Sequence, residues 1–275
     1  MTKETTKKEL KEVVEKPKTK KKDKKQWEFK CYSGLLKKLI NRVKMLNTEI
    51  KINVDQKGIS TKVVDPAHVA MVYISIPRKD FYTGHTAVNK ENGYKCREPF
   101  DFGIDLDKLS KTLKLCSEYD YLTGYIQNNS LYIDTDKIHK KIGLLDTAGM
   151  PEPKIPELQL DVKAEVSSSD IGILIKASDE TCDYLSLIAD KTGLYSVIEE
   201  DEDNLKIDLS KDVKGNGRAI YSTDYFSNII KGIGYNHVTL EFSTDQPIQI
   251  SGDIYDTGSF MYLLAPRIEG EKDER

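Results

Sequence analysis

The chain has only 4 Cys and 1 Trp among its 275 residues, and it contains no long apolar run. The cysteines are widely separated and form no C-x-x-C pair, so the sequence predicts neither a disulfide framework nor a zinc knuckle. No stretch approaches the roughly 18 apolar residues of a membrane span, and the lysine-rich N-terminus has no apolar signal core. We therefore expect a soluble, intracellular protein with reduced cysteines, namely Cys31, Cys96, Cys116 and Cys182.

Motifs of catalysis are also missing. There is no G-x-x-x-x-G-K-[ST] segment for nucleotide phosphates, and the 4 His show no H-E-x-x-H or comparable metal-binding spacing. Two glycine pairs, in Gly215–Gly217 and Gly232–Gly234, are typical of a hairpin turn and a helix end respectively. We expect no catalytic residues, no metal and no cofactor, and hence a protein that is not an enzyme.

The net charge of −3 averages two unlike parts. Residues 1–25 hold 11 Lys against 5 acidic residues, a net of +6, so the other 250 residues carry a net of −9. Residues 1–26 are polar and low in complexity, and we expect a disordered basic tail. A tether to DNA, a nuclear-import signal in Lys16–Lys25 and a dispensable extension are three interpretations that the sequence leaves open.

Beyond the tail, short runs rich in β-branched and aromatic residues alternate with four helical patterns, two in each half, which indicates a duplicated domain. The predicted helices are Gly34–Leu46, Asp107–Cys116, Ser169–Ser178 and Thr223–Gly232. The predicted strands include Ile50–Val54, Gly58–Val64, Ala70–Ile76, Leu131–Asp134, Leu160–Val166, Leu205–Leu209, His237–Phe242 and Phe260–Leu264. Three prolines in Asp146–Leu158 predict an extended connector. The expected parts are therefore a tail (1–26), a first domain (27–145), a connector (146–158), a second domain (159–269) and a charged C-terminal tail (270–275).

Three segments carry a family resemblance. They are Val63–Pro77 (VVDPAHVAMVYISIP), Phe260–Glu269 (FMYLLAPRIE) and Gly149–Leu158 (GMPEPKIPEL). In this order they resemble the proliferating cell nuclear antigen (PCNA) family of DNA sliding clamps, archaeal members above all, over about Trp27–Glu269. The resemblance implies an α+β clamp fold of two similar domains, each with antiparallel sheets outside and two short helices inside. It implies a homotrimeric ring that encircles duplex DNA as a polymerase processivity factor.

The helices concentrate positive charge within an acidic body. Lysines and one arginine on the first two helices lie opposite an apolar stripe, a pattern typical of an amphipathic helix with one face on a sheet. A solvated helix face is the plain alternative. In the resembled fold these helices line the hole, where they meet phosphates without reading sequence. The expected DNA-facing residues are Lys37, Lys38, Arg42, Lys44, Lys108, Lys111, Lys114, Lys176 and Lys231.

Two segments of opposite charge are candidates for the contact between subunits. Lys137–Lys141 (KIHKK) and Glu199–Asp203 (EEDED), with its continuation Leu205–Leu209, fall at or beside the family's edge strands, and edge strands are available for pairing with another chain. An acidic hairpin tip is the alternative for EEDED. The expected interface residues are Lys137, His139, Lys140, Lys141, Glu199, Glu200, Asp201, Leu205 and Ile207.

The resemblance also implies an apolar pocket for partner peptides beneath the connector. Its expected residues are Val64, His68, Met71, Ala148, Met150, Pro247, Leu263, Ala265 and Pro266. The implied partners are double-stranded DNA, further copies of the chain, an ATP-dependent clamp loader, a DNA polymerase, a flap endonuclease and a ligase. The loop Phe81–Pro99 is longer than the family pattern, and its role stays open.

Other functions remain possible at this stage. The nearest is one subunit of a heteromeric or checkpoint-type clamp, and a more distant one is a β-rich enzyme acting on nucleic acid. The expected location is the cytoplasm or nucleoid for an archaeal or viral protein, and the nucleus for a eukaryotic one.

Overall fold

A computed structural model describes residues 24–81, 93–179, 183–200, 203–234 and 237–267. We call the part before residue 146 the N-terminal lobe and the part after residue 158 the C-terminal lobe. The N-terminal lobe contains β1 (Trp27–Tyr32), α1 (Ser33–Val43), β2 (Glu49–Val54), β3 (Gly58–Val64), β4 (Ala70–Pro77), η1 (Arg78–Phe81), β5 (Tyr94–Cys96), β6 (Phe100–Asp105), α2 (Leu106–Leu113), β7 (Tyr121–Gln127), β8 (Ser130–Asp134) and β9 (His139–Gly143). The C-terminal lobe contains β10 (Val162–Ser167), α3 (Ser168–Asp179), β11 (Tyr184–Asp190), β12 (Gly193–Glu200), β13 (Asp203–Ser210), β14 (Val213–Lys214), β15 (Gly217–Ser222), α4 (Thr223–Ile233), β16 (His237–Phe242), β17 (Ile248–Ile254) and β18 (Gly258–Leu264).

The two lobes repeat one arrangement. Apart from η1, the order of strands and helices from β1 to β9 is the same as the order from β10 to β18. The pairings correspond as well: β1 lies between β5 and β7, and its counterpart β10 lies between β14 and β16. The duplication predicted from two helices in each half is therefore visible in the topology.

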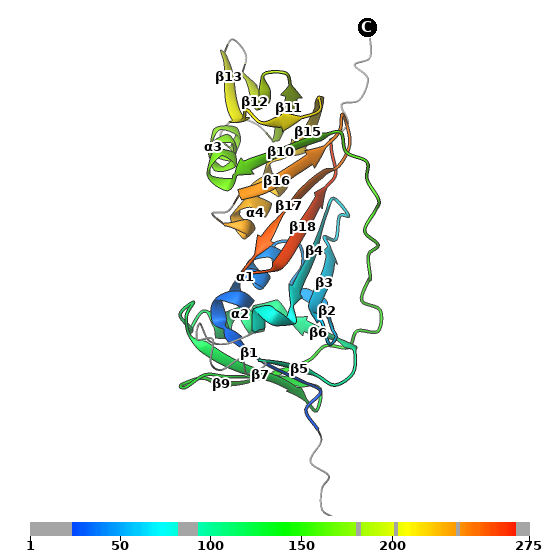
Figure 1. Cartoon of the computed structure of the whole chain (residues 1–275), viewed down its shortest axis with the longest axis vertical. Coiled ribbons are helices and arrows are strands. Elements are labelled where there is room, and N and C mark those ends of the chain that lie inside the picture. Colours follow the sequence, from blue (N-terminus) through cyan, green and yellow to red (C-terminus); the bar gives the residue numbers. More distant parts are fainter. Residues whose placement is uncertain (1–23, 82–92, 180–182, 201–202, 235–236, 268–275) are drawn as a thin grey trace, which may run out of the picture.

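The strands form three antiparallel sheets within the described residues. One end of the molecule has the sheet β5-β1-β7-β8-β9, and the other end has β13-β12-β11-β15. Between them, β14-β10-β16-β17-β18-β4-β3-β2-β6 runs through both lobes, and its middle pair, β18 with β4, joins them (Figure 1). Each lobe therefore ends in a sheet with a free edge, β9 in one and β13 in the other.

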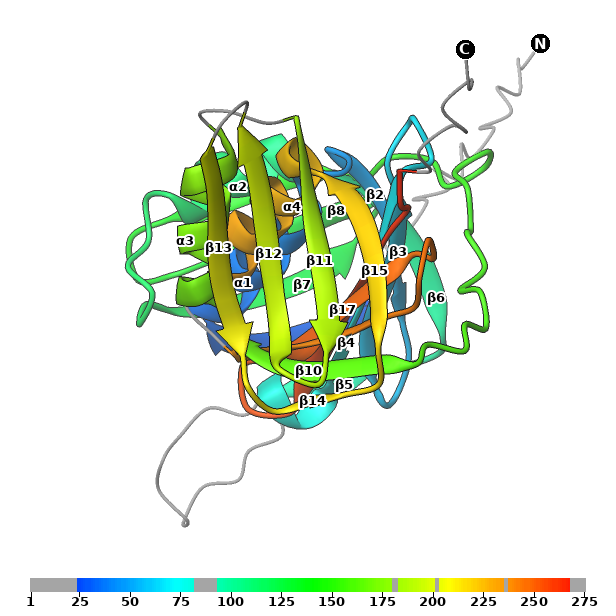
Figure 2. The ribbon, with the colours of Figure 1, turned by 90° about the horizontal axis from the view of Figure 1, so that it is seen from above.

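The helices pack on the inner faces of these sheets. Alternate residues of the strands are buried, as in Trp27 and Phe29 of β1, so one face of each sheet joins an apolar core that extends through both lobes. Figure 2 looks down on the sheet β13-β12-β11-β15, with helices behind it. In Figure 1 the helices lie on the left of the molecule, and the connector between β9 and β10 runs along the right.

The predicted α+β fold with antiparallel sheets and short helices is confirmed. All four predicted helices are present, but the first ends at Val43 rather than Leu46, and the second runs from Leu106 to Leu113. Residues 149–158 form no helix or strand, as their prolines predicted, and the strand predicted from Leu160 begins at Val162. The predicted strand around KIHKK begins only at His139, because Thr135–Ile138 make a turn closed by hydrogen bonds to the Thr135 hydroxyl.

Several predictions fall partly outside the described residues. Both predicted tails do so, except for Lys24, Lys25 and Gln26. Of the loop Phe81–Pro99, residues 82–92 lie outside, whereas Tyr94–Cys96 form β5 and pair with β1. The EEDED segment contains the end of β12 and the start of β13, with residues 201–202 outside.

Candidate functional site

Helix α1 is amphipathic. Leu35 and Leu39 recur at helical spacing and are buried against the sheets. Lys38 is exposed, and the half-buried Lys37 donates a hydrogen bond from Nζ to the carbonyl oxygen of Cys116 at 2.5 Å. Lys37 and Lys38 therefore lie next to each other on the side of α1 away from the core, and Lys37 is hydrogen-bonded to the segment that follows α2.

Helix α2 begins at a capping carboxylate and carries the densest set of lysines. Asp105 accepts hydrogen bonds from the backbone amides of Asp107 and Lys108, at 2.9 and 3.1 Å, which satisfies donors of the first helical turn. Burial alone would raise the pKa of Asp105, but these amides and the Lys108 ammonium at 3.1 Å lower it below its ordinary value. Lys108, Lys111 and Lys114 are all exposed.

The cationic helix face belongs mainly to the N-terminal lobe. Lys44, directly after α1, reaches α2 and pairs with Asp107 at 2.5 Å. In the C-terminal lobe, α3 and α4 each expose one lysine, Lys176 and Lys231, and each has an acidic residue in its first turn. The positive charge around the four helices is therefore unequal between the lobes.

Arg42 does not belong to this face, and its prediction as a DNA-facing residue is wrong. Its side chain is 1% exposed, with the guanidinium 5.0 Å from the ring centre of Phe260. Nη1 donates to the carbonyl oxygen of Lys38 at 3.2 Å, and Nη2 donates to that of Ile233, the last residue of α4, at 3.0 Å. Burial lowers the pKa of the guanidinium. Arg42 thus links α1 to α4, and so one lobe to the other.

A groove of about 420 Å³ lies between the connector and the central sheet. Six predicted pocket residues line it: Val64, His68, Met71, Pro247, Leu263 and Ala265. Met71 of β4 pairs with Val64 on one side and with Leu263 of β18 on the other, so three neighbouring strands supply the floor. The opposite wall comes from the connector residues Pro151, Glu152, Pro153, Lys154 and Pro156.

The rim of the groove is held by two carboxylates. Glu152 of the connector accepts a hydrogen bond from Lys51 of β2 at 2.9 Å, and this contact lowers the pKa of Glu152. Asp65, in the turn between β3 and β4, accepts from three backbone amides of that turn at 2.6–3.0 Å. Burial alone would raise the pKa of Asp65, but the amides and the Tyr225 hydroxyl lower it. The turn places His68 on the rim with a φ of 57°.

The other three predicted pocket residues lie outside the groove lining. The terminal methyl of Met150 packs on β6, 2.8 Å from where a Cβ on Gly103 would stand. Ala148 is exposed beside the carboxylate of Asp146, to which its amide donates at 3.0 Å. Pro266 follows Ala265 and is half-buried without lining the groove. Of the residues taken from the family motif, those on the strands line the groove, whereas the connector residues that reach it begin at Pro151.

The two free edges carry several of the predicted interface residues. His139, Lys140 and Lys141 are exposed on β9, with Lys137 in the turn before it. Leu205 of β13 is 49% exposed and Ile207 is half-buried. Glu199 and Glu200 lie on β12, the strand beside the edge strand β13, and Asp201 lies outside the described residues. Glu200, at the end of β12, pairs with Asp203, at the start of β13, so the described residues of EEDED belong to this pair of antiparallel strands.

Over the described ranges, no group of three or more His, Cys, Asp or Glu side chains is placed to hold a metal ion. No helix in this part of the chain has the length and apolar character needed to cross a bilayer. Cys31, Cys96 and Cys116 are free thiols, and Cys182 lies outside the described residues.

Comparison with known proteins identifies relatives over most of the chain. Residues 26–138 match the family model "Proliferating cell nuclear antigen, N-terminal domain". The DNA polymerase sliding clamp of Methanothrix thermoacetophila is 31% identical over 247 residues, which cover 86% of this chain and 96% of that protein. The corresponding clamp of Methanosarcina barkeri is 29% identical over the same shares.

Solved structures of PCNA proteins match this chain as well. PCNA of A. fulgidus, solved with the C-terminal region of FEN-1 bound, matches with a TM-score of 0.78 and 26% identity, covering 89% of this chain and 100% of that one. PCNA of Entamoeba histolytica matches with a TM-score of 0.77 and 18% identity over the same shares, which is a likeness of fold.

The duplicated lobes, the lysine-bearing inner helices and the free sheet edges are those of a clamp-type subunit. The relatives named above are DNA polymerase sliding clamps, which are not enzymes. The matches in sequence and structure cover 86% and 89% of the chain. The chain belongs to the PCNA family of DNA polymerase sliding clamps.

Proposed function

We propose that three copies of this chain close head to tail into a ring around duplex DNA, with residues 27–145 and 159–269 as the two clamp domains of each copy. The pairing of β18 with β4 carries this proposal. In the internal repeat, β18 is the counterpart of β9, and β4 is the counterpart of β13. The pair β18–β4 is thus formed within the chain. The two strands of the equivalent pair, β9 and β13, lie at opposite ends of the same molecule and are edge strands there. Pairing β9 of one copy with β13 of the next repeats this pair, as ring closure requires.

The helices support the same contact. At the pair β18–β4 within the chain, α1 packs on α4 so closely that a Cβ on Gly232 would come within 2.8 Å of the carbonyl oxygen of Asn41. Their counterparts at the free edges are α3 and α2. Ile173 of α3 is 57% exposed, and Leu115, just after α2, is 73% exposed. Pairing of the edges would cover these apolar side chains, which gives the contact a hydrophobic component.

The ring would hold DNA through the exposed lysines of its helices. Ammonium groups at loose, water-mediated distances neutralise phosphates without reading bases, so the ring can slide. Because most of these lysines belong to the N-terminal lobe, that lobe would contribute most of the electrostatic attraction to the DNA phosphates. The buried Arg42 is not part of this proposal. The proposed DNA-facing residues are Lys37, Lys38, Lys44, Lys108, Lys111, Lys114, Lys176 and Lys231.

The groove under the connector is proposed as the docking site for partner peptides. It combines Met71 and small apolar residues with a proline-rich wall, a surface that accepts varied peptides. The A. fulgidus relative was solved with the C-terminal region of FEN-1 bound, which supports a flap endonuclease as one partner here. A polymerase, a ligase and an ATP-dependent loader belong to the same proposal, as does an intracellular, DNA-associated location.

The test combines mass with topology. Sedimentation of the purified chain should give the mass of a trimer, and Ile173→Glu or Leu115→Glu should each shift it towards the monomer. Tyr184→Ser is the matched control, because Tyr184 is 41% exposed on the inner strand β11. After loading, the protein should stay on circular duplex and slide off linear duplex. A monomer that binds both forms equally would exclude the ring.

A further inference from the structure

The outer face of the sheet β5-β1-β7-β8-β9 carries an aromatic column. Because Phe29 of β1 faces the core, its neighbour Glu28 faces outward, and the outward row continues through Tyr125 of β7, Tyr132 of β8 and Lys141 of β9. The two tyrosine rings are stacked, with centroids 4.7 Å apart and planes 6° apart. The column is therefore a single aromatic unit across two strands.

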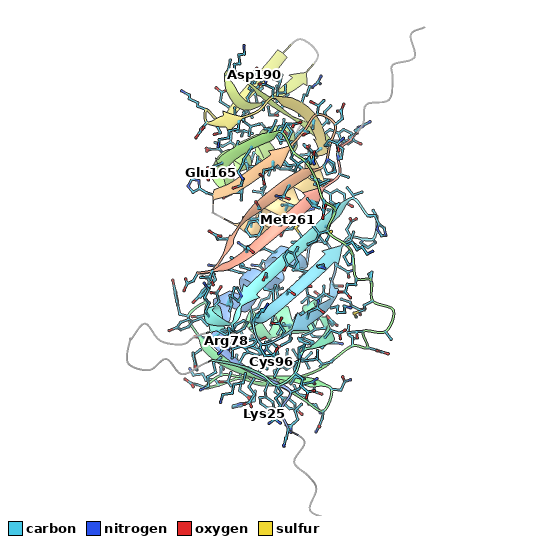
Figure 3. The ribbon with its side chains drawn as sticks, turned by 45° about the vertical axis from the view of Figure 1, so that its right-hand side comes forward. Lys25, Arg78, Cys96, Glu165, Asp190 and Met261 are labelled. Atoms are coloured by element: carbon cyan, nitrogen blue, oxygen red, sulfur yellow. The ribbon has the colours of Figure 1, made fainter. Side chains whose placement is uncertain are left out.

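A lysine closes each end of this column. The Lys25 ammonium lies 4.2 Å from the ring centre of Tyr125, and the Lys141 ammonium lies 5.8 Å from that of Tyr132. The end at Tyr132 is thus the looser one. Lys25 lies at the lower end of the molecule in Figure 3, beyond the sheet and away from the helices.

The internal repeat shows that the fold does not require these tyrosines. The counterpart row in the C-terminal lobe runs through Lys163, Glu241, Gln249 and Leu263. There, Lys163 pairs with Glu241 at 3.0 Å and Gln249 donates to the same carboxylate at 2.8 Å. Ionic and amide groups suffice at these backbone positions, so the tyrosines provide something that sheet stability does not need.

Charge on this face is positive within a body whose net charge is −9. Lys95 of β5 is exposed opposite Glu28 at one end of the row, and Lys141 of β9 is exposed at the other end. The acidic neighbours are engaged: Glu28 pairs with Lys25 at 3.1 Å, and Asp134 lies 3.0 Å from His139. The face therefore combines aromatic rings with ammonium groups.

From this combination we infer that the outer face of the N-terminal lobe binds single-stranded DNA, with a base stacking on Tyr132 and lysines contacting the phosphates. Proteins that bind single strands without sequence preference pair aromatic platforms with cationic surface in this way. A base can replace the Lys141 ammonium on the ring of Tyr132, and the ammonium can then turn to a neighbouring phosphate. Duplex DNA keeps its bases stacked inside the helix, so the column selects for the single strand.

The test uses the full chain and a fluorescein-labelled oligothymidylate, with binding followed by fluorescence anisotropy at several salt concentrations and without any loader. Tyr132→Ala should weaken binding about tenfold, the loss expected for one stacked base. Tyr132→Phe keeps the ring and should bind as the wild type does. Lys95→Ala should reduce the salt slope by about 0.7, as the loss of one phosphate contact on a single strand does.

Tyr195→Ala is the matched control, because Tyr195 is a half-buried tyrosine on the outer side of the other lobe, with Lys206 3.9 Å from its ring centre. It should bind oligothymidylate normally. Equal binding by Tyr132→Ala and the wild type, with unchanged thermal melting, would overturn the inference, as would equally tight binding of polyglutamate. Tyr132→Ala should still form the trimer and stay on circular duplex, so the outcome is independent of the ring.

Discussion

The hydroxyl of Tyr225 in α4 donates a 2.8 Å hydrogen bond to the carboxylate of Asp65, 160 residues earlier in the chain. The same carboxylate holds the turn between β3 and β4 that carries His68 to the groove. Both lobes therefore fix one rim of the proposed partner site. A change in α4 can alter that rim without touching any residue that lines the groove.

Asp65→Ala should lower the free energy of unfolding by about 3 kcal/mol at pH 7, because the amides of Ala67, Val69 and Ala70 and the Tyr225 hydroxyl lose their charged acceptor. The native contacts lower the pKa of Asp65, so its stabilisation is complete above the pKa of an unfolded aspartate, about 3.9, and disappears as the pH falls through the lower native pKa. Urea unfolding from pH 7 to pH 2 measures this. A difference between variant and wild type that persists undiminished at pH 2 contradicts the role of the charge.

Arg42→Ala should destabilise the protein by about 2–4 kcal/mol, because it leaves the Ile233 carbonyl without its charged donor and opens space beside Phe260. Retention on circular duplex by the folded ring should stay the same, since the guanidinium is buried. Thermal melting and retention, measured on the same preparation, check both statements. Normal melting with faster loss of DNA would instead place Arg42 in contact with phosphates.

Neutralising lysines should have unequal effects in the two lobes. Lys38→Ala, Lys111→Ala and Lys114→Ala together should shorten residence on circular duplex and reduce its salt dependence, because each phosphate contact contributes about 0.9 to the salt slope. The pair Lys176→Ala and Lys231→Ala should do less. Melting temperatures should hardly change, since all five side chains are exposed. If both sets of substitutions shorten residence on circular duplex equally, the N-terminal lobe does not contribute more to DNA binding than the C-terminal lobe.

Ala265→Glu should abolish binding of a partner peptide, because it places a carboxylate in the apolar groove. Ala148→Glu makes the same change on the connector but outside the groove, and it should bind normally. Titration calorimetry with a peptide from a flap endonuclease C-terminus compares the two variants, and sedimentation confirms that the rings are intact. Loss of binding in Ala148→Glu as well would move the site along the connector.

The sequence predicted most of the secondary structure for identifiable reasons. Leu35 and Leu39 recur at helical spacing, and the prolines in residues 151–156 exclude helix. Strand β9 was placed about two residues early, because charge and length do not reveal the turn that Thr135 closes. Long-range features such as the pairing of β18 with β4 join residues nearly 200 positions apart, and local patterns contain no information about them.

The site was predicted less completely. Sequence reasoning took Arg42 as a DNA contact because of its charge, although it follows Leu35 and Leu39 at the i, i+4, i+7 spacing of the buried stripe. That spacing was the available signal. The tyrosine column was missed because Tyr125 and Tyr132 meet only through the register of β7 and β8. Met150 was assigned to the groove by motif, whereas its contact with Gly103 depends on how the connector leaves the sheet.

The continuous nine-stranded sheet has a mechanical consequence. Its hydrogen bonds and the apolar core continue from one lobe into the other. A force that turns one lobe therefore turns the other lobe with it. In the proposed ring of three copies, the contacts between neighbouring copies contain no covalent backbone, so they are the places where the ring would open. On that proposal, entry of a closed circular DNA needs another protein to separate one contact while the other two hold.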